Sequence, residues 1–155
     1  MIRIANKKDI DLIIYFIKKI AEYENLLDQV VLDKDILFDY LFNKKIAKCK
    51  FILEDNKEVG FALYFYNFST FKGKAGLYLE DIYILKEYRN KGYGKALFLD
   101  LLKEAKENNL GRMEWTCLNW NEPSIKFYKG LGAKGMDEWT TYRIDESQFI
   151  DILND

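Results

Sequence analysis

Histidine is absent from this chain of 155 residues. A Ser-His-Asp triad, a Cys-His pair and a His-Glu-x-x-His zinc helix are therefore excluded. No metal site is expected. Any catalysis must use carboxylates, tyrosine, lysine, backbone amides or a cofactor.

Cysteine and long apolar runs are also scarce. The only cysteines, Cys49 and Cys117, lie far apart among strand-like residues, which predicts buried, reduced thiols in a cytoplasmic protein. The N-terminus has no apolar core of signal-peptide length. The uncharged stretch 59–71 is well short of the ~20 apolar residues that a membrane helix requires, so no membrane association is expected.

An excess of positive charge is missing too. The 24 Lys and Arg residues face 25 Asp and Glu residues, which argues against a nucleic-acid partner. Hydrophobic residues make up 49% of the chain, too many for a disordered protein. The length suits one domain, residues 1–155, and a chain of this size buries ~70% of the surface that it exposes when unfolded.

Hydrophobic spacing predicts an α/β fold with a mixed, mostly antiparallel sheet flanked by helices. Strands are expected at residues 2–5, 50–54, 59–66, 77–85 and 112–118, with a hairpin turn at 55–57 and a terminal hairpin or long strand at 136–144. Helices are expected from Asp9 to about Asn25, from Asp33 to Asn43, at about 91–108 up to Gly111, from Asn121 to about Gly130, and at 146–153.

Two of these helices have predicted apolar faces near the N-terminus. In the first, Ile10, Ile13, Ile14, Ile17 and Ala21 recur at helical spacing, and Asp9 is the expected N-cap. In the second, the residues expected to face inward are Ile36, Leu37, Tyr40 and Leu41, with Asp33 as the N-cap.

The most informative stretch is residues 80–95, where a predicted strand leads into a basic turn with two glycines and then directly into a helix. Gly92 and Gly94 let the backbone approach a ligand closely, and the unpaired amides of a helix N-terminus attract an anion. Three cations surround the turn: Arg89, Lys91 and Lys95. A plain surface turn can carry the same letters, but the flanking strand and helix favour a phosphate site.

These motifs, with the order of elements, resemble the GNAT superfamily of acetyl-coenzyme A dependent N-acetyltransferases. Arg89-Asn90-Lys91-Gly92-Tyr93-Gly94 is similar to the pyrophosphate loop of that family, and residues 121–128 are similar to its later coenzyme-binding helix. Three shorter motifs are similar to the diamine (spermidine/spermine) and thialysine acetyltransferase group: Tyr78-Leu79-Glu80-Asp81, Trp120-Asn121-Glu122-Pro123 and Ala21-Glu22-Tyr23-Glu24.

The resemblance implies acetyl transfer from acetyl-CoA to a primary amine of a small cationic acceptor, by direct attack in a ternary complex, and it suggests a homodimer. It implies that Tyr128 is the general acid and that Glu80 removes the amine proton, directly or through water. The residues that it places at the cosubstrate are Ile82, Tyr83, Ile84, Arg89, Asn90, Lys91, Gly92, Tyr93, Gly94, Lys95, Asn121, Glu122, Pro123, Ser124 and Tyr128. Those that it places at the acceptor are Tyr23, Glu24, Glu80 and Asp137.

Glu80 and Asp81 are adjacent, so in a regular strand they face opposite sides of the sheet and only one can serve the amine. A β-bulge would change this count and would splay the strand from its parallel neighbour, residues 112–118. An alkylammonium has a pKa of ~10.4 and must lose a proton before it attacks a thioester. A carboxylate in a dry cleft becomes a better base because burial raises its pKa.

Other interpretations stay open from the residues alone. Tyr128 lies among Ile125, Phe127 and Leu131, where core packing is the ordinary role, and carboxylates near a helix end are usually just solvated. A protein or peptide amine acetyltransferase would need an open groove in place of an acidic pocket. A non-catalytic acyl-CoA sensing module would keep the phosphate site without turnover.

Overall fold

The computed structural model describes residues 1–154, which fall into two compact units, Met1–Thr116 and a second that begins at Cys117. The single-domain organisation expected from the length stays a prediction. Among the described residues, no helix combines the length and the apolar character needed to cross a bilayer.

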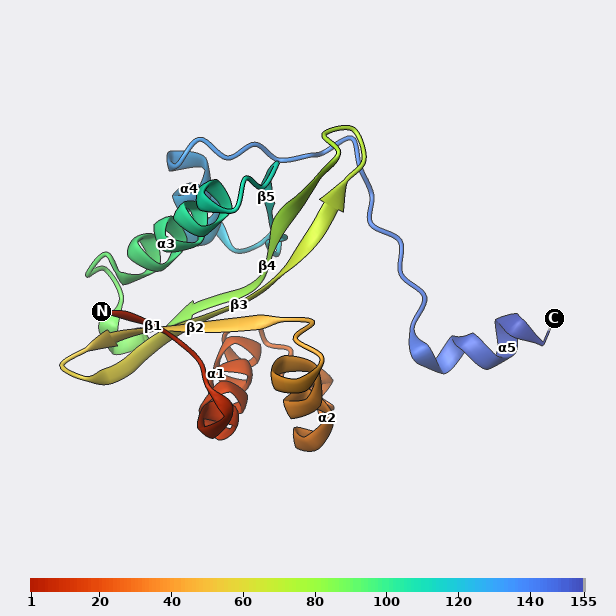
Figure 1. The fold of residues 1–155 in the computed structure, drawn as a ribbon, viewed down its shortest axis with the longest axis horizontal. Helices are drawn as coiled ribbons and strands as arrows, with labels where there is room; N and C mark the ends of the chain where they lie inside the picture. Colours follow the sequence, from red (N-terminus) through yellow and green to blue (C-terminus); the bar gives the residue numbers. More distant parts are fainter. Residues whose placement is uncertain (155) are drawn as a thin grey trace. The chain divides into compact units, whose positions relative to one another are not determined.

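The first unit is built on a five-stranded sheet of order β1-β2-β3-β4-β5 (Figure 1). Its strands are β1 (Ile2–Ile4), β2 (Lys48–Glu54), β3 (Lys57–Ser69), β4 (Lys74–Ile84) and β5 (Met113–Glu114). The first four pair antiparallel and β5 pairs parallel with β4. The predicted mixed, mostly antiparallel sheet is therefore confirmed.

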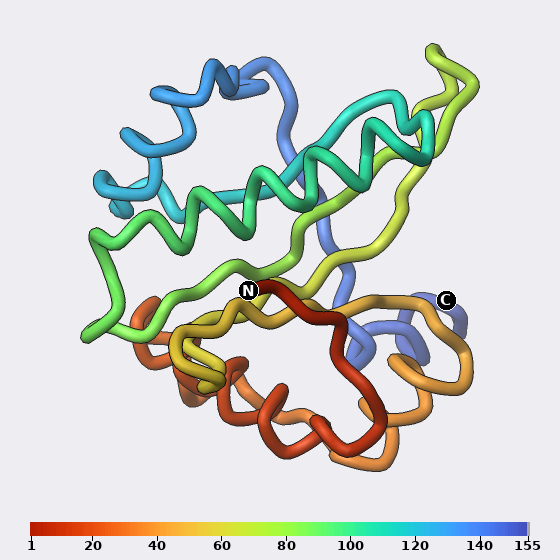
Figure 2. The backbone as a smooth tube through the Cα atoms, turned by 60° about the vertical axis from the view of Figure 1, so that its left-hand side comes forward, coloured from red at the N-terminus to blue at the C-terminus, as the bar shows by residue number. Residues whose placement is uncertain are grey.

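Helices cover both faces of this sheet (Figures 1 and 2). On one face lie α1 (Ile10–Tyr23) and α2 (Lys34–Phe38), the second of which continues into a π-helical turn at Asp39–Asn43. On the other face lies α3 (Tyr93–Glu107), which packs against β2, β3 and β4. Short 3-10 turns occur at Lys7–Asp9, Leu27–Gln29 and Lys86–Tyr88.

The core under α1 is aromatic. Phe16 on α1 stacks on Phe61 of β3 with ring centroids 5.2 Å apart, and Phe51 of β2 lies beside them. Ile10, Ile13 and Ala21 are buried as expected, whereas Ile14 and Ile17 lie at the edge of the core. This packing holds α1 against β3 and β4, and so fixes the position of its C-terminal end near the site described below.

The expected inner face of the second helix is partly wrong. Leu41 is buried and Leu37 packs against the core, but Ile36 and Tyr40 are 59% and 45% exposed. For Tyr40 the reason is the π-helical turn that follows α2, because its wider winding breaks the 3.6-residue spacing on which the prediction rested. The predicted cap is confirmed, since Asp33 accepts hydrogen bonds from the amides of residues 35 and 36.

Asp9 is not the cap that the sequence predicts. Its carboxylate accepts two hydrogen bonds of 2.8 Å from Arg3 and one of 2.7 Å from the amide of Asn6, and makes no bond to the first turn of α1. The bonds from the guanidinium of Arg3 and the amide of Asn6 engage both carboxylate oxygens away from α1. Asn6 caps the preceding 3-10 turn in its place.

The hairpin of β2 and β3 is confirmed. Asp55 and Asn56 both have positive φ, 48° and 62°, as the two central residues of a type I′ turn require. At the other end of the sheet, α3 ends at Glu107 and the left-handed residue is Asn109, with φ of 55°. The expectation that Gly111 ends this helix is therefore wrong, because asparagine also tolerates that conformation.

The second unit contains α4 (Glu122–Gly130), a 3-10 turn at Glu146–Gln148 and α5 (Phe149–Leu153). The helix α4 begins as predicted, with Asn121 accepting a hydrogen bond from the amide of Ser124 and Pro123 in the first turn. The predicted strand at residues 136–144 is wrong, because the described part of the chain forms no strand after β5. A strand requires a neighbour for its backbone hydrogen bonds, and residue pattern alone does not supply one.

Two further expectations need correction. The strand expected at residues 112–118 shortens to the two residues of β5. Cys49 is buried as expected, but Cys117, which follows that shortened strand, is only partly buried. Burial raises the pKa of the Cys49 thiol far above its ordinary value, so this thiol stays protonated.

A polar cluster joins α3 to the sheet beneath it. Glu104 accepts hydrogen bonds of 2.7 Å from the hydroxyls of Tyr64 and Tyr66 and forms an ion pair of 2.7 Å with Lys50, which also contacts Asp100. Burial raises the pKa of Glu104, but the hydrogen bonds from Lys50, Tyr66 and Tyr64 outweigh burial and bring it to about 2. The cluster fixes the C-terminal half of α3 on the sheet.

We expect Glu104→Gln to lower the free energy of unfolding by about 2 kcal/mol at pH 7, because Lys50 loses a partner while it is 9% exposed. The pKa of Glu104 is lower in the folded protein than in the unfolded chain, so its charge stabilises the fold above pH 4.5. This contribution is lost as the pH falls through about 2. The deficit of the variant should therefore shrink over that range in urea titrations. An equal deficit at pH 7 and pH 2 would contradict the assigned charge, and Glu107→Gln, at an exposed pair of 3.8 Å, is the control.

Candidate active site

The centre of the site is a β-bulge in β4. Leu63 of β3 pairs with Asp81 and Tyr64 pairs with Leu79, so Glu80 is an extra residue without a partner on β3. Pairing between β4 and β5 covers only Leu77 and Tyr78, immediately before the bulge. The conditional prediction of a bulge that parts β4 from its parallel neighbour is therefore confirmed.

The bulge leaves backbone amides of β4 beyond the end of β5. The amide of Leu85 donates to Val59 of β3, and alternate residues of an antiparallel strand direct their backbone groups to opposite sides. The amides of Ile84 and Ile82 consequently point away from β3, on the side where the pairing with β5 has ended. Tyr83, between them, directs its amide to β3 and its ring toward α1.

Three carboxylates converge near the bulge, from β4 and from the end of α1. Burial, then the nearby charges of Glu80 and Glu24, raise the pKa of Asp81 to about 7. Burial also raises the pKa of Glu24. Glu80 itself is exposed. A site with this much negative charge, partly removed from water, is suited to a cationic ligand and to accepting a proton near neutral pH.

The turn before α3 has the geometry of an anion site. Gly92 is the N-cap of α3 with φ of 83°, and no side chain caps the helix there. The first turn of α3 contains no acidic residue, so its free amides and dipole face no competing negative charge. Asn90 is also left-handed, with φ of 62°. The residues present therefore fit a phosphate group.

Alanine at position 92 would test this geometry. A Cβ there would meet no atom within 4 Å, so the cost of Gly92→Ala comes from φ alone and is about 1 kcal/mol of folding stability. We expect calorimetric affinity for acetyl-CoA to fall about tenfold, because the turn relaxes and the amides lose their alignment. Gly130→Ala, at an open helical position without positive φ, should leave the affinity unchanged and should not lower the stability.

The side chains of this turn do not all face the expected ligand. Lys91 forms an ion pair of 2.9 Å with Glu54, and the hydroxyl of Tyr93 donates to the same carboxylate at 2.6 Å. Arg89 donates from Nε to the carbonyl of Ile84 at 3.0 Å and turns toward α1. Lys95 is exposed and has no ion-pair partner within residues 1–154.

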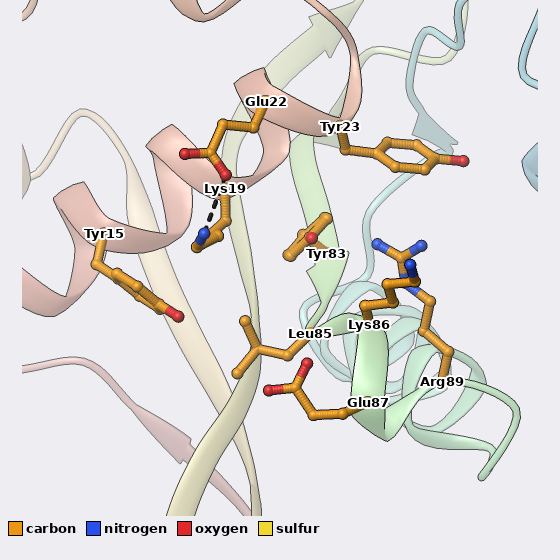
Figure 3. A pocket seen from close by; sticks show the side chains of 9 residues that line it. All are labelled: Tyr15, Lys19, Glu22, Tyr23, Tyr83, Leu85, Lys86, Glu87 and Arg89. Atoms are coloured by element: carbon orange, nitrogen blue, oxygen red, sulfur yellow. Dashed lines mark hydrogen bonds and ion pairs between the residues drawn. The ribbon is translucent and has the colours of Figure 1, made fainter.

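A cavity of about 540 Å³ lies between the end of α1 and the turn after β4 (Figure 3). The guanidinium of Arg89 lies 4.8 Å from the ring centroid of Tyr23 and 5.1 Å from that of Tyr83. Lys86 and Glu87 complete the same side of the cavity. The structure thus brings Tyr23, an expected acceptor residue, together with Arg89 of the expected phosphate loop.

The other predicted residues lie in the second unit. Asn121 is buried at the start of α4, Ser124 is partly buried, and Glu122 and Pro123 are exposed. Tyr128 is partly buried on α4, with its ring 5.4 Å from that of Phe127. Asp137 is exposed in the segment without regular structure. Their roles at the site stay predictions.

Sequence reasoning missed Asp81, Lys86 and Glu87. A regular strand places Asp81 on the opposite face from Glu80, and only the bulge alters that. Lys86 and Glu87 follow the strand directly and belong to no motif of their own. The signal that would have found them is their position between Tyr83 and Arg89, both assigned to the site by the resemblance.

Comparison with known proteins agrees with this geometry. The family model described as the acetyltransferase (GNAT) family matches residues 17–133. The chain belongs to this family. It is therefore an acetyltransferase, as expected from the loop at residues 89–94.

Individual relatives indicate which group within the family the chain resembles. The chain is 41% identical over 104 residues to an L-ornithine N5-acetyltransferase of Arabidopsis thaliana, a match covering 66% of this chain and 46% of that protein. It is 31% identical over 157 residues to a thialysine N-epsilon-acetyltransferase of Bos taurus, covering 94% and 92%. The expected resemblance to the diamine and thialysine group is confirmed.

A solved structure supports the fold in the same way. An integron cassette protein from the mobile metagenome of V. cholerae superposes with a TM-score of 0.81 at 27% identity, covering 100% of this chain and 98% of that one. The GNAT enzyme described here therefore has the fold that its motifs predict.

Proposed function

We propose that this acetyltransferase moves the acetyl group of acetyl-CoA to a primary amine of a small cationic acceptor, by direct attack in a ternary complex. The observation that carries the proposal is the meeting of Glu24, Glu80 and Asp81 beside the bulge, where β4 leaves β5. Ornithine and thialysine, named for the two relatives, are small molecules with a side-chain amine.

Backbone amides of β4 and of the turn before α3 are proposed to bind the cosubstrate, acetyl-CoA. The amides of Ile82 and Ile84 hold the pantetheine arm and the acetyl carbonyl, and the turn from Asn90 to Lys95 holds the pyrophosphate. An amide aimed at the carbonyl oxygen also stabilises the oxyanion that forms when the amine attacks. Residues 121–124 are proposed to flank the coenzyme.

Proton removal falls to the pair Glu80 and Asp81. Glu80 is the base expected from the family, and its exposed carboxylate can receive the ammonium. Asp81, with a pKa of about 7, is the better proton acceptor at neutral pH, since a base works best when its pKa lies near the working pH. Because the two charges interact, the pair titrates as a unit, and transfer can run through Glu80 directly or through water.

The leaving thiolate receives its proton from Tyr128. A thiol has a pKa of ~8.5 and a tyrosine ~10, so this transfer is uphill by roughly 2 kcal/mol, a small part of a catalytic barrier. Tyr23 and Asp137 are proposed to line the acceptor site, and a cytoplasmic homodimer is the proposed state of the enzyme.

An amine panel tests the proposed function. Release of free coenzyme thiol is measured with acetyl-CoA and, in turn, ornithine, thialysine, putrescine, spermidine and a lysine-containing peptide. We expect turnover with at least one of the small amines and little with the peptide. If calorimetry detects acetyl-CoA binding and no amine gives thiol release, a sensing module replaces the enzyme; preferred turnover of the peptide would indicate a protein acetyltransferase.

A further inference from the structure

The cavity of Figure 3 has both signs of charge on one rim. Lys86, Glu87 and Arg89 come from a single turn, the one that joins β4 to the phosphate loop. Within residues 1–154, neither Lys86 nor Glu87 has an ion-pair partner, and the terminal nitrogens of Arg89 make no hydrogen bond. Charged groups left without partners beside a cavity are free to bind a ligand.

The guanidinium of Arg89 is held in place although its terminal nitrogens have no polar partner. Its Nε donates to Ile84, and its Cζ lies beside the rings of Tyr23 and Tyr83, 4.8 and 5.1 Å from their centroids, which are 6.2 Å apart. An arginine fixed in this way presents its remaining N–H groups in a set direction at little entropic cost. That arrangement suits a planar carboxylate, which accepts two parallel hydrogen bonds.

Asp81 lies on the face of β4 that also lines the cavity. Asp81, Tyr83 and Leu85 alternate with residues of the opposite face, so they line the same side of the strand, and α1 covers that side with Tyr23 beside Glu24. Asp81 lies two residues, roughly 6.7 Å along the strand, before Tyr83, and the guanidinium of Arg89 lies beside the ring of Tyr83. A basic amino acid such as ornithine or lysine places its side-chain nitrogen roughly 6 to 8 Å from its carboxyl carbon when extended, given bonds of ~1.5 Å.

We propose that Lys86, Glu87 and Arg89 form a subsite for the α-amino-acid head group of the acceptor, so that the enzyme prefers a basic amino acid over a diamine. Lys86 and Arg89 bind the α-carboxylate and Glu87 binds the α-ammonium, while the side-chain amine reaches Glu80 and Asp81. This inference rests on the proposed function. A diamine has no group for the cationic part of the rim, and it leaves that charge unpaired.

Matched pairs of acceptors test the subsite, since putrescine is ornithine without its carboxyl group and cadaverine is lysine without its own. We expect kcat/KM to be at least about tenfold higher for each amino acid than for its diamine, the size of a hydrogen bond to a charged group. Lys86→Met should reduce that preference about tenfold. Lys18→Met, an exposed residue of α1 outside the cavity, should leave it unchanged.

Each result has a single meaning. Equal or better turnover of the diamines, or equal losses for both acceptors in Lys86→Met, would overturn the subsite while leaving the proposed function intact. If no amine is turned over, the proposed function fails, and calorimetry still decides the subsite. Ornithine should then bind more tightly than putrescine to the wild type, and Lys86→Met should remove the difference; ornithine binding that the variant does not weaken would refute the subsite.

Discussion

Replacing Tyr128 by Phe is expected to lower kcat by roughly 10²- to 10⁴-fold, the range that a positioned general acid contributes. The substitution removes only the hydroxyl, so the thiolate must leave without a proton donor. We expect the dissociation constant of acetyl-CoA, measured by calorimetry on the same sample, to change less than about twofold, because the phosphate and pantetheine are proposed to bind backbone amides and not this hydroxyl.

The same variant separates catalysis from packing. Tyr128 is partly buried beside Phe127, and a purely structural role predicts a loss of stability with kcat preserved in the molecules that fold. Phe127→Leu perturbs packing on the same helix without touching the hydroxyl of Tyr128, so it serves as the control. Unchanged kcat in Tyr128→Phe would remove Tyr128 from the mechanism and favour a sensing role.

Replacing each carboxylate of the bulge by its amide, one at a time, tests which of them accepts the proton. Asp81→Asn should lower kcat/KM by roughly 10²- to 10⁴-fold at pH 7 and abolish the rise in rate with an apparent pKa near 7 that the wild type should show. Glu80→Gln should retain that rise, moved to lower pH, because a negative neighbour no longer raises the pKa of Asp81. The measurement is kcat/KM against pH for all three proteins.

The opposite pattern would reassign the base. If Glu80→Gln loses the pH-dependent rise and Asp81→Asn keeps it, Glu80 accepts the proton directly and Asp81 has an electrostatic role. Circular dichroism spectra of the three proteins are compared as a control. Matching spectra would indicate that the loss of the pH-dependent rise in kcat/KM reflects the loss of a base and not a change in fold.

Asp81→Asn, which should lower activity, should raise the free energy of unfolding. Its folded pKa of about 7 lies above the ordinary value of 3.8, so the folded protein binds the extra proton between these pH values and loses stability as pH rises through that window. Asp81→Asn removes this cost and should unfold at a higher denaturant concentration at pH 8, by up to about 4 kcal/mol, with little gain at pH 4. Activity and stability therefore trade against each other at this residue.

Local bonds explain which elements could be predicted. The turn at Asp55 and Asn56, the cap at Asp33 and the start of α4 at Asn121 follow from the sequence because each depends on bonds within four residues of the chain. The prediction for Asp9 is wrong because its partner, Arg3, belongs to another element. The prediction for Tyr40 is wrong because a π-helical turn changes the spacing.

Residues 136–144 show that a sequence pattern alone does not decide whether a strand forms. The sequence predicts a terminal hairpin or long strand here, yet a strand depends on a partner, which the described chain does not supply to these residues. The conditional prediction at Glu80 fared better because it named the alternative, a bulge, along with its consequence for β5.

The sequence by itself determined the family, the glycine turn before α3 and the residue types available for chemistry, because the motif around Gly92 is local and the lack of histidine is a matter of composition. Only the tertiary structure decided that Asp81 interacts with Glu80 and Glu24, and that the guanidinium of Arg89 lies beside the rings of Tyr23 and Tyr83. The reason is that pKa and side-chain direction depend on burial and on neighbours from distant elements, and these arise only when α1 packs on the bulged β4.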